Sequence, residues 1–285
     1  MLKKIIYLFQ GILLSVLFLF LRIIPLNFSS HLLGTIAKII GPKLSISKKA
    51  FDNIKNVMPE KNEKETLKII KSMWENLGRV IGEYPHLKKI VPDNNNKIQV
   101  SGKKNLLLIK KTKTPAIFFS AHLANWEIAP MVAIKAGIPV LVIFREPNNP
   151  IVNLLIKYLR SNLLMAPKGK KGAKKIIYSL RNGISVGLVI DQKMNDGIKV
   201  PFFNKPAMTS DALAQLCLKI KSLVVPVQVE RIKNTNFKVT FHNPVRISKN
   251  GKKKSPLQIM TEVNLIIEKW IRKNPGQWLW LHRRW

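Results

Sequence analysis

Cysteine is almost absent from this chain, which has 285 residues and Cys217 as its single thiol. One cysteine excludes intrachain disulfides and metal sites built from cysteine clusters. No histidine-rich or cysteine-rich tract occurs either, so we predict no bound metal. Cys217 itself lies in an apolar helical pattern, which is typical of a position packed in the core.

Acidic residues are also scarce, because 15 Asp and Glu accompany 49 Lys and Arg and give a formal net charge of +34. Such a surface attracts anions, namely nucleic acid, anionic lipid headgroups or an acidic protein. Charge alone does not choose among these partners. The chain also lacks internal repeats and disordered linkers, and its length allows one large domain or two small ones.

Charged residues are missing entirely from residues 5–21, close to the N-terminus. As a helix, these 17 residues would span about 26 Å, slightly less than a hydrocarbon core of roughly 30 Å. The flank at residues 22–25 lacks the small-residue cleavage site of a signal peptide. We therefore predict that residues 1–25 form an uncleaved membrane anchor, spanning or interfacial, and prefer this to a signal peptide or a buried helix.

The remainder, residues 26–285, is interpreted as a single α/β domain whose first part, residues 26–95, is helical. Residues 32–40 predict an amphipathic helix that packs against the body or lies at the membrane interface. Two further amphipathic patterns flank the helix-breaking Met-Pro-Glu at residues 58–60. Their apolar positions are Ala50, Ile54 and Val57 before the break, and Leu67, Ile70, Met73, Leu77 and Ile81 after it.

Short apolar runs alternate with helical patterns over residues 96–285. This alternation predicts an α/β fold with a mainly parallel central sheet flanked by helices. A short turn joins the last two runs, which predicts that this pair is antiparallel. The candidate strands are Ile98–Val100, Ala116–Phe119, Pro139–Phe144, Ile184–Ile190, Val224–Val229 and Phe237–Phe241.

One apolar run stops at Ser120 and is followed by a histidine and, five residues after that, by a glutamate. Residues five apart on a helix point about 140° away from each other. His122 and Glu127 can therefore meet only if His122 lies in the turn before the helix, for which Asn125 is the predicted N-cap. Base, carboxylate and free helix amides would then share the C-terminal end of a strand, where α/β sheets bind ligands. A purely structural His–carboxylate pair fits the same spacing.

The stretch HLANWE, residues 122–127, resembles the His-x4-acidic signature of the glycerolipid and lipid A acyltransferase superfamily. Its glutamate, preceded by Asn125 and Trp126, resembles the lipid A late acyltransferase branch, the lauroyl and myristoyl transferases. The segments AFDNIKNVMPEKNEKE and MWENLGRVIGEY resemble the N-terminal helical region of that family, and the closing NPGQWLWLHRRW resembles its last block. The resemblance covers most of the chain.

This resemblance implies transfer of an acyl chain from acyl carrier protein to a hydroxyl group of a lipid A precursor, without a further cofactor. His122 would be the general base, Glu127 would orient its imidazole, and helix N-terminal amides would stabilise the oxyanion. The basic surface suits the strongly acidic carrier protein, and we expect no nucleic acid partner. The implied location is the bacterial inner membrane, with the catalytic domain on the cytoplasmic side, which the absence of disulfides also favours.

Two arginines are candidate substrate-binding residues. Arg145 follows an apolar strand and matches the family's Arg-x-x-Asn-Asn-Pro stretch, with a solvated loop arginine as the alternative. Arg160 lies where the family carries an arginine linked to activity, although Lys157 and Tyr158 replace the residues often found before it. The planar fork of arginine suits the phosphates of a lipid A precursor.

Asp191 and Gln192 are the other candidate substrate-binding residues. They begin the polar part of IDQKMNDGIKVPFFNKPAMT, which resembles a block in the family. Asp191 would orient a basic group or maintain the shape of the site, and a plain strand-terminating Asp is the alternative. The nearby segment Gly183–Gly187 matches the Gly-x-Ser-x-Gly pattern of serine hydrolases. We interpret that match as accidental, because a nucleophile elbow needs a strand before its serine and a helix after it.

Basic and aromatic residues supply candidate contacts to phosphates or to the membrane interface. Residues 168–175, KGKKGAKK, lack P-loop spacing, so Lys168 and Lys170 are candidates only for attracting an anionic headgroup or carrier. In the closing block, tryptophans are interleaved with arginines, as at membrane interfaces. The candidates there are Trp278, Arg283 and Arg284, together with Trp280 and Trp285.

We interpret the sequence as a membrane-anchored acyltransferase that adds a secondary acyl chain to a lipid A precursor of the Kdo-lipid IVA type. An acyltransferase for another glycolipid or a glycerolipid is the nearest alternative. The alternative from another class is a non-catalytic basic protein that binds anionic membranes or nucleic acid. Its binding would fall steeply with salt, and it would not need His122 or Glu127.

Overall fold

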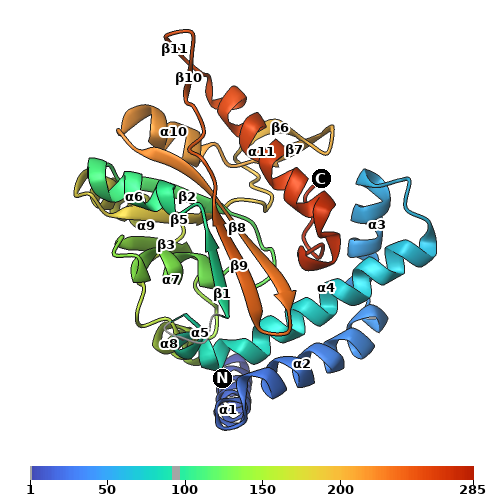
Figure 1. The fold of residues 1–285 in the computed structure, drawn as a ribbon. Helices are drawn as coiled ribbons and strands as arrows, with labels where there is room; N and C mark the ends of the chain where they lie inside the picture. The colour runs from blue at the N-terminus through green and yellow to red at the C-terminus, as the bar shows by residue number, and fades with distance from the viewer. Residues whose placement is uncertain (1, 92–96) are drawn as a thin grey trace.

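The computed structural model describes residues 2–91 and 97–285 of the chain. The strands of its central sheet are β1 (Ile98–Ser101), β2 (Ala116–Ser120), β3 (Val140–Phe144), β4 (Leu164–Pro167), β5 (Ser185–Val189), β8 (Leu223–Lys233) and β9 (Asn236–Phe241). Their order is β1-β9-β8-β2-β5-β3-β4, and each neighbouring pair except β8 and β9 is parallel (Figure 1). The structure confirms the predicted mainly parallel sheet and its antiparallel last pair.

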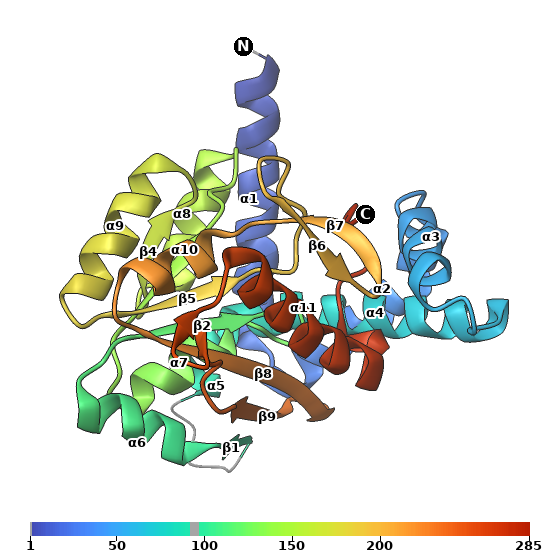
Figure 2. The same cartoon turned by 90° about the horizontal axis from the view of Figure 1, so that it is seen from above.

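Helices cover both faces of this sheet (Figures 1 and 2). The helices of the described chain are α1 (Leu2–Ile23), α2 (Leu26–Ile40), α3 (Ser47–Val57), α4 (Glu63–Glu83), α5 (Leu87–Ile90), α6 (Lys103–Thr112), α7 (Ile128–Lys135), α8 (Pro150–Leu159), α9 (Lys170–Arg181), α10 (Ala212–Lys219) and α11 (Pro256–Lys273). Successive strand residues point to opposite faces. Phe118 therefore packs in the core with α5, α6 and α7, whereas Phe119 packs with α9, α10 and α11. Cys217 of α10 lies in the same core as Phe119, and its predicted burial is confirmed.

Helices α2 and α4 lie side by side at one edge of the molecule (Figure 1). Glycines bring their backbones close together. A Cβ added to Gly78 of α4 would stand 2.2 Å from the carbonyl oxygen of Leu33 in α2, so no larger residue fits at this crossing. The break that was predicted at residues 58–60 is confirmed, because α3 ends at Val57 and α4 begins at Glu63.

The buried stripe of α4 differs in part from the predicted one. Ile70 and Met73 are buried as expected, but Leu67 is 41% exposed and Ile81 is 37% exposed. The helix is turned so that Ile69 joins Ile70 and Met73 in the core, while Leu67 and Ile81 face outward. The spacing of apolar residues in α4 is compatible with burial of either of two faces of the helix. The close contact of α2 with the glycines of α4 determines which face is buried.

Helix α1 is the one helix in residues 2–91 and 97–285 that is long and apolar enough to cross a membrane. Residues 4–23 form its apolar segment, and these 20 residues would span about 30 Å. One stripe of α1 rests on the body, where Gly11 touches Ile151 of α8 and Leu21 is fully buried. The other sides expose apolar side chains and extend beyond the body toward the N-terminus (Figure 2). The predicted N-terminal apolar helix is confirmed.

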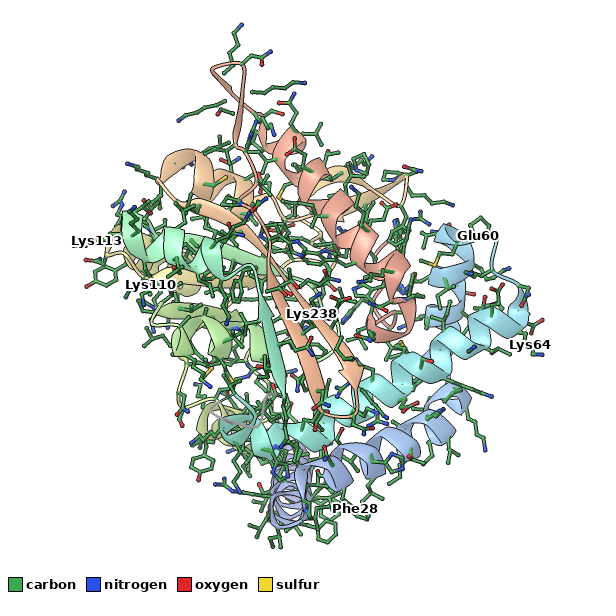
Figure 3. The ribbon with its side chains drawn as sticks, in the orientation of Figure 1. Phe28, Glu60, Lys64, Lys110, Lys113 and Lys238 are labelled. Carbon is green, nitrogen blue, oxygen red and sulfur yellow. The ribbon has the colours of Figure 1, made fainter. Side chains whose placement is uncertain are left out.

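The surface carries its apolar and its basic side chains in different places. Phe28 of α2 is 56% exposed and adds to the apolar surface around α1 (Figure 3). Basic side chains are spread more widely, as Lys64 of α4, Lys110 of α6 and Lys238 of β9 illustrate (Figure 3). Such a distribution gives a general attraction for anions, so a specific anion site has to be sought in the geometry of a cavity.

Candidate active site

His122 and Asp191 face each other across two neighbouring strands. Strands β2 and β5 are parallel, and Ser120 at the end of one is paired with Val189 at the end of the other. His122 and Asp191 each stand two residues beyond these partners, so the register of the sheet brings them together at its C-terminal edge. The imidazole Nδ1 lies 2.8 Å from Asp191 Oδ1, and the backbone N–H of His122 donates to Asp191 Oδ2 at 2.9 Å.

Asp191 is well placed to fix the tautomer of His122. It is 2% exposed, and the indole Nε1 of Trp278 donates to its Oδ2 at 2.6 Å. Burial by itself raises the pKa of this carboxyl, but the imidazole of His122 and the hydrogen bonds hold the pKa well below its usual range. An ionised Asp191 keeps the proton of a neutral imidazole on Nδ1, so Nε2 carries the lone pair that can accept a proton. This geometry places Asp191 beside the base that it was predicted to orient.

A cavity of about 440 Å³ lies beside His122 and runs along the face of the sheet. Polar and charged groups gather where the strands end, and apolar groups line the part that lies against the strands. The first group is His122, Glu127, Arg145, Arg160, Lys168, Gln192 and His282, and the second includes Phe118, Val140, Val142, Gly187, Val189 and Val227. Ala129 and Pro130 of α7 cover it from the other side. The cavity thus joins a candidate base to an apolar compartment.

Comparison with protein families shows which family the whole chain belongs to. The family described as bacterial lipid A biosynthesis acyltransferase matches residues 2–285. The chain belongs to this family. A search of curated proteins finds no match. Membership confirms the resemblance that HLANWE indicated, and it establishes an acyltransferase of lipid A biosynthesis, for which a lipid A precursor is the acceptor.

In this acyltransferase, Glu127 has partners other than His122, and the predicted contact between the two is wrong for this structure. The hydroxyl of Tyr84 donates to Glu127 Oε1 at 2.9 Å, and Arg160 forms an ion pair with the same oxygen. No hydrogen bond joins Glu127 to His122 in the part of the chain that the structure describes. The chain turns through Ala124, whose φ is 49°, and Glu127 is 3% exposed beside Tyr84 and Arg160. A carboxylate this deeply buried needs such a counter-charge.

Glu127 and Arg160 line the cavity, and the hydroxyl of Tyr84 bonds to both of them. Burial opposes the charge of Arg160, but Glu127 and Tyr84 outweigh it and raise the pKa of the guanidinium. Burial and the charge of Glu127 raise the pKa of Tyr84 well above its usual range, so Tyr84 keeps its proton and donates it. Arg160 Nε is buried without a hydrogen-bond partner among the described residues. The predicted binding residue Arg160 therefore lies at the site as a fixed cation with one donor unused.

A second histidine at the cavity had not been predicted. Gln192 Nε2 lies 2.9 Å from His282 Nε2 and 3.3 Å from His122 Nε2, so one amide group connects the two rings. Burial, followed by the charge of His122, lowers the pKa of His282. Both imidazoles can then accept from the amide of Gln192 in their neutral forms. The closing His-Arg-Arg of the sequence was the available signal for His282, but its position beside β2 depends on tertiary packing.

The remaining basic candidates differ in their placement. Arg145 and Lys168 are exposed side chains that line the cavity where the strands end. Lys170 begins α9, and Arg283 lies near the C-terminus. Both are exposed, and neither lines the cavity. Two of the four are therefore positioned to meet an anion that enters the cavity.

The prediction that Trp278 and Arg284 contact the membrane interface is wrong. Trp278 is 1% exposed and Arg284 is 0% exposed, because the C-terminal segment packs inside the body. The guanidinium of Arg284 donates to the carbonyl oxygen of Met208 and to Thr209 Oγ1, and burial lowers its pKa to about 10. These partners belong to a hairpin of β6 (Ile198–Phe202) and β7 (Lys205–Thr209), which the sequence analysis had missed. Trp280, at 0% exposed, is buried as well.

The predicted roles of Asn125 and of the helix amides also change. Helix α7 begins only at Ile128, so Asn125 is not its N-cap residue. The side-chain oxygen of Asn125 accepts from the backbone N–H of Glu127 at 3.2 Å, and its carbonyl oxygen accepts from that of Ile128 at 3.2 Å. These two amides are already satisfied and are not free to stabilise an oxyanion.

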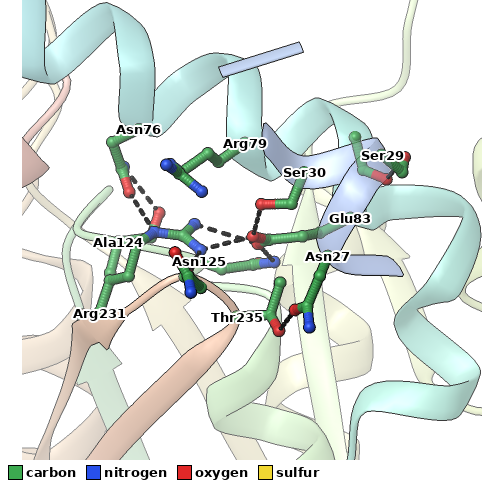
Figure 4. Close-up of polar contacts among 12 residues, drawn as sticks. Asn27, Ser29, Ser30, Asn76, Arg79, Glu83, Ala124, Asn125, Arg231 and Thr235 are labelled. Carbon is green, nitrogen blue, oxygen red and sulfur yellow. Dashed lines mark hydrogen bonds and ion pairs between the residues drawn. The ribbon is translucent and has the colours of Figure 1, made fainter. Parts of the chain in front are cut away.

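Asn125 is fixed in turn by a buried polar network (Figure 4). Its Nδ2 donates to Glu83 Oε2 at 2.8 Å, and Ser30 Oγ donates to Glu83 Oε1 at 2.7 Å. Arg231 of β8 forms a bidentate pair with the same carboxylate, at 2.5 and 3.0 Å. The side chain of Glu83 is 0% exposed. The network ties α2, α4 and β8 to the turn that carries His122.

Glu83→Gln should destabilise the protein strongly, because it leaves the buried guanidinium of Arg231 without its counter-charge. We expect a loss of about 3–5 kcal/mol in the free energy of unfolding, measured by denaturant titration in detergent. The double variant Glu83→Gln/Arg231→Met should recover a large part of this loss, since it removes the unpaired charge. Glu146→Gln breaks an exposed ion pair with Lys157 and should change stability little. Equal effects of Glu83→Gln and Glu146→Gln would contradict this account of the network.

Proposed function

We propose that the protein transfers an acyl chain from acyl carrier protein to a hydroxyl group of a lipid A precursor of the Kdo-lipid IVA type. The observation that carries the proposal is His122, held through Nδ1 by the buried Asp191, beside an apolar cavity. The family supplies the reaction class and the kind of acceptor. The identity of the donor, the role of each residue and secondary acylation are the parts that we add.

In the proposed reaction, Nε2 of His122 takes the proton of the acceptor hydroxyl as its oxygen attacks the thioester carbonyl. The tetrahedral intermediate then collapses, and the C–S bond breaks. The imidazolium returns its proton to the departing thiolate, so the products are the ester and the free thiol of the carrier. Asp191 keeps the imidazole in the right tautomer and stabilises the imidazolium while it exists.

Direct transfer without an acyl-enzyme fits the side chains that are present. Cys217 of α10 is packed in the core and does not line the cavity. Burial raises the pKa of its thiol to about 11. Ser185 lies within β5 and accepts from the backbone N–H of Ala116, as expected if its Gly-x-Ser-x-Gly match is accidental. Among the described residues, neither side chain has a hydrogen bond to a base that would activate it as a nucleophile. The nucleophile is then the substrate hydroxyl, which His122 activates by taking its proton.

The apolar end of the cavity suits the acyl chain of the donor, and the polar end suits the phosphates of the substrates. Apolar side chains of β2, β3 and β5 would enclose the acyl chain. Arg145, Lys168 and the unused donor of Arg160 would meet the phosphates of the acceptor or of the carrier's prosthetic arm. Glu127 would hold Arg160 in place rather than orient the imidazole. The net charge of +34 would attract an acidic carrier protein over a longer range.

The proposed location is the inner membrane of a bacterium, with the cavity on the cytoplasmic side. The exposed apolar sides of α1 support attachment to a bilayer. A soluble carrier that delivers acyl chains and an acceptor held in the bilayer would both be accessible there. Exposed Phe28 on α2 would add contact with the acyl region of the lipid next to α1.

A substrate panel tests this proposal. Purified full-length protein in detergent or vesicles would receive acyl chains on acyl carrier protein or on coenzyme A, with tetra-acylated lipid A precursor or a lysophospholipid as acceptor. Mass spectrometry would measure the products. We expect the precursor to gain one acyl chain, most rapidly from acyl carrier protein. Transfer only to the lysophospholipid, or from coenzyme A alone, would contradict the proposed acceptor or donor, and no transfer by folded protein would contradict the function.

A further inference from the structure

Gly187 occupies an unusual place for a glycine, in the middle of the interior strand β5. Its neighbours in the sheet are Phe118 of β2 and Val142 of β3. Glycine is disfavoured inside strands, and where it occurs there it often marks a site at which a ligand approaches closely. Gly187 lines the cavity and is not fully buried, although strands flank it on both sides. The space above it is therefore the cavity itself.

Neither the backbone nor the neighbouring side chains require glycine at this position. Gly187 has no left-handed φ of the kind that excludes other residues. An added Cβ would stand 3.5 Å from Val140 Cγ1 and 3.8 Å from Val142 Cγ2, which are ordinary contact distances. The contrast with Gly78, where backbone atoms block any Cβ, is clear. What glycine supplies at position 187 is empty volume within the cavity.

Gly187 lies in the apolar part of the cavity, far from His122. It stands four residues before Asp191 on an extended strand, about 13 Å from the edge of the sheet where His122 lies. Around it the lining is apolar, with Phe118, Val140 and Val142 on the same face of the sheet. Phe118 is held edge-on by Phe241, with ring centroids 5.7 Å apart, so this wall is firmly packed.

We infer that Gly187 sets the length of the acyl chain that the cavity accepts, by leaving room at the end remote from His122. The inference rests on the proposed function, since it takes the apolar part of the cavity as the site of the donor's acyl chain. A side chain at position 187 would occupy the space of the terminal methylenes. It would shorten the accepted chain without touching the reacting carbonyl.

Three variants with growing side chains test the inference: Gly187→Ala, Gly187→Val and Gly187→Leu. Each is assayed with carrier-protein donors of 10, 12, 14 and 16 carbons, and the rate ratio between long and short donors is the readout. One excluded methylene in an apolar pocket is worth about 10–200-fold in specificity. We expect the ratio to fall by at least about tenfold with Val and further with Leu, because the longer donors lose more rate than the shorter ones.

Two further variants separate cavity filling from general disturbance of β5. Val186→Ile enlarges the next residue, which packs in the opposite core and does not line the cavity, so the donor preference should stay that of wild type. Val142→Ala added to Gly187→Val removes the Val142 methyl group that an added Cβ would meet at 3.8 Å, and it should restore longer donors.

The outcomes distinguish the inference from the proposed function. A stepwise shift toward shorter donors supports the inference. Unchanged preference in folded Gly187→Leu, or an equal loss with all donors, overturns it while wild-type transfer leaves the function standing. Failure of the wild-type protein with every donor overturns the proposed function itself.

Discussion

The variant His122→Ala should turn over its substrates about 10²–10⁴-fold more slowly than wild type, which is the usual contribution of a general base. The reason is that Nε2 of His122 is the proposed acceptor of the hydroxyl proton, and alanine offers no replacement. The measurement is transfer of a labelled acyl chain from acyl carrier protein to the precursor at saturating concentrations. His31→Ala is the matched control, because His31 is exposed on α2 away from the cavity and its loss should leave turnover unchanged.

The folded state of the His122→Ala protein can be checked by its thermal unfolding midpoint, since the half-buried ring of His122 lies at the rim of the cavity. A loss of tenfold or less in well-folded protein would remove His122 from the role of base. A comparable loss in His31→Ala would show that turnover in the assay responds to histidine loss in general.

Asp191→Asn should have an effect in the same range, about 10²–10⁴-fold on turnover. An asparagine at this position can donate its N–H to Nδ1 of His122, which would place the imidazole proton on Nε2 and leave no base toward the cavity. The contact from Trp278 Nε1 can persist on the asparagine oxygen, so the geometry of the turn should change little. The change should therefore lower kcat more than it raises KM.

Asp196→Asn is the matched control for that substitution, because Asp196 is exposed in the loop that follows Asp191. It should retain the turnover of wild type. Near-normal turnover in Asp191→Asn would show that the tautomer of His122 is fixed by something other than Asp191. A fall in turnover accompanied by a large fall in the unfolding midpoint would assign Asp191 to stability instead.

The parts of the fold that depend on local pattern were predictable. Each of the six candidate strands exists with ends within a few residues of the prediction, because apolar runs bounded by polar turns identify buried strands. The apolar N-terminal helix was identified in the same way. The hairpin of β6 and β7 was missed, because its strands contain Pro201 and Pro206 and its turn has positive φ at Phe203 and Asn204. Its pairing is settled by that turn rather than by alternation.

The candidate site was predictable residue by residue but not contact by contact. His122, Glu127, Arg160 and Asp191 all reach the same region, yet their pairing depends on which strands are neighbours. The order of strands in a sheet cannot be read from the spacing of residues along the chain. Asp191, on the adjacent strand, therefore meets His122 in place of the glutamate five residues away. The sequence contained both carboxylates, and only the tertiary structure assigns each to its partner.

The tryptophans and arginines near the C-terminus are a second case in which the sequence did not reveal the contacts of the side chains. Trp278 and Arg284 have the composition of a membrane interface, but amphipathic side chains also fill buried sites that contain polar partners. Asp191 accepts from Trp278, and Met208 and Thr209 accept from Arg284. Those partners are distant in sequence, so composition favoured the wrong surroundings. Trp278 therefore supports the site residue Asp191 from within the body, and Arg284 supports the hairpin of β6 and β7.

The measurement that tests the central claim most directly compares turnover in His122→Ala, Asp191→Asn and the double variant under one set of conditions. If His122 and Asp191 act as a unit in proton transfer, the double variant should be no slower than the slower single variant, within about tenfold, because losses in such a unit are not additive. Multiplied losses, with the double variant slower by the product of the two single effects, would contradict the account and show that the two residues contribute to transfer independently.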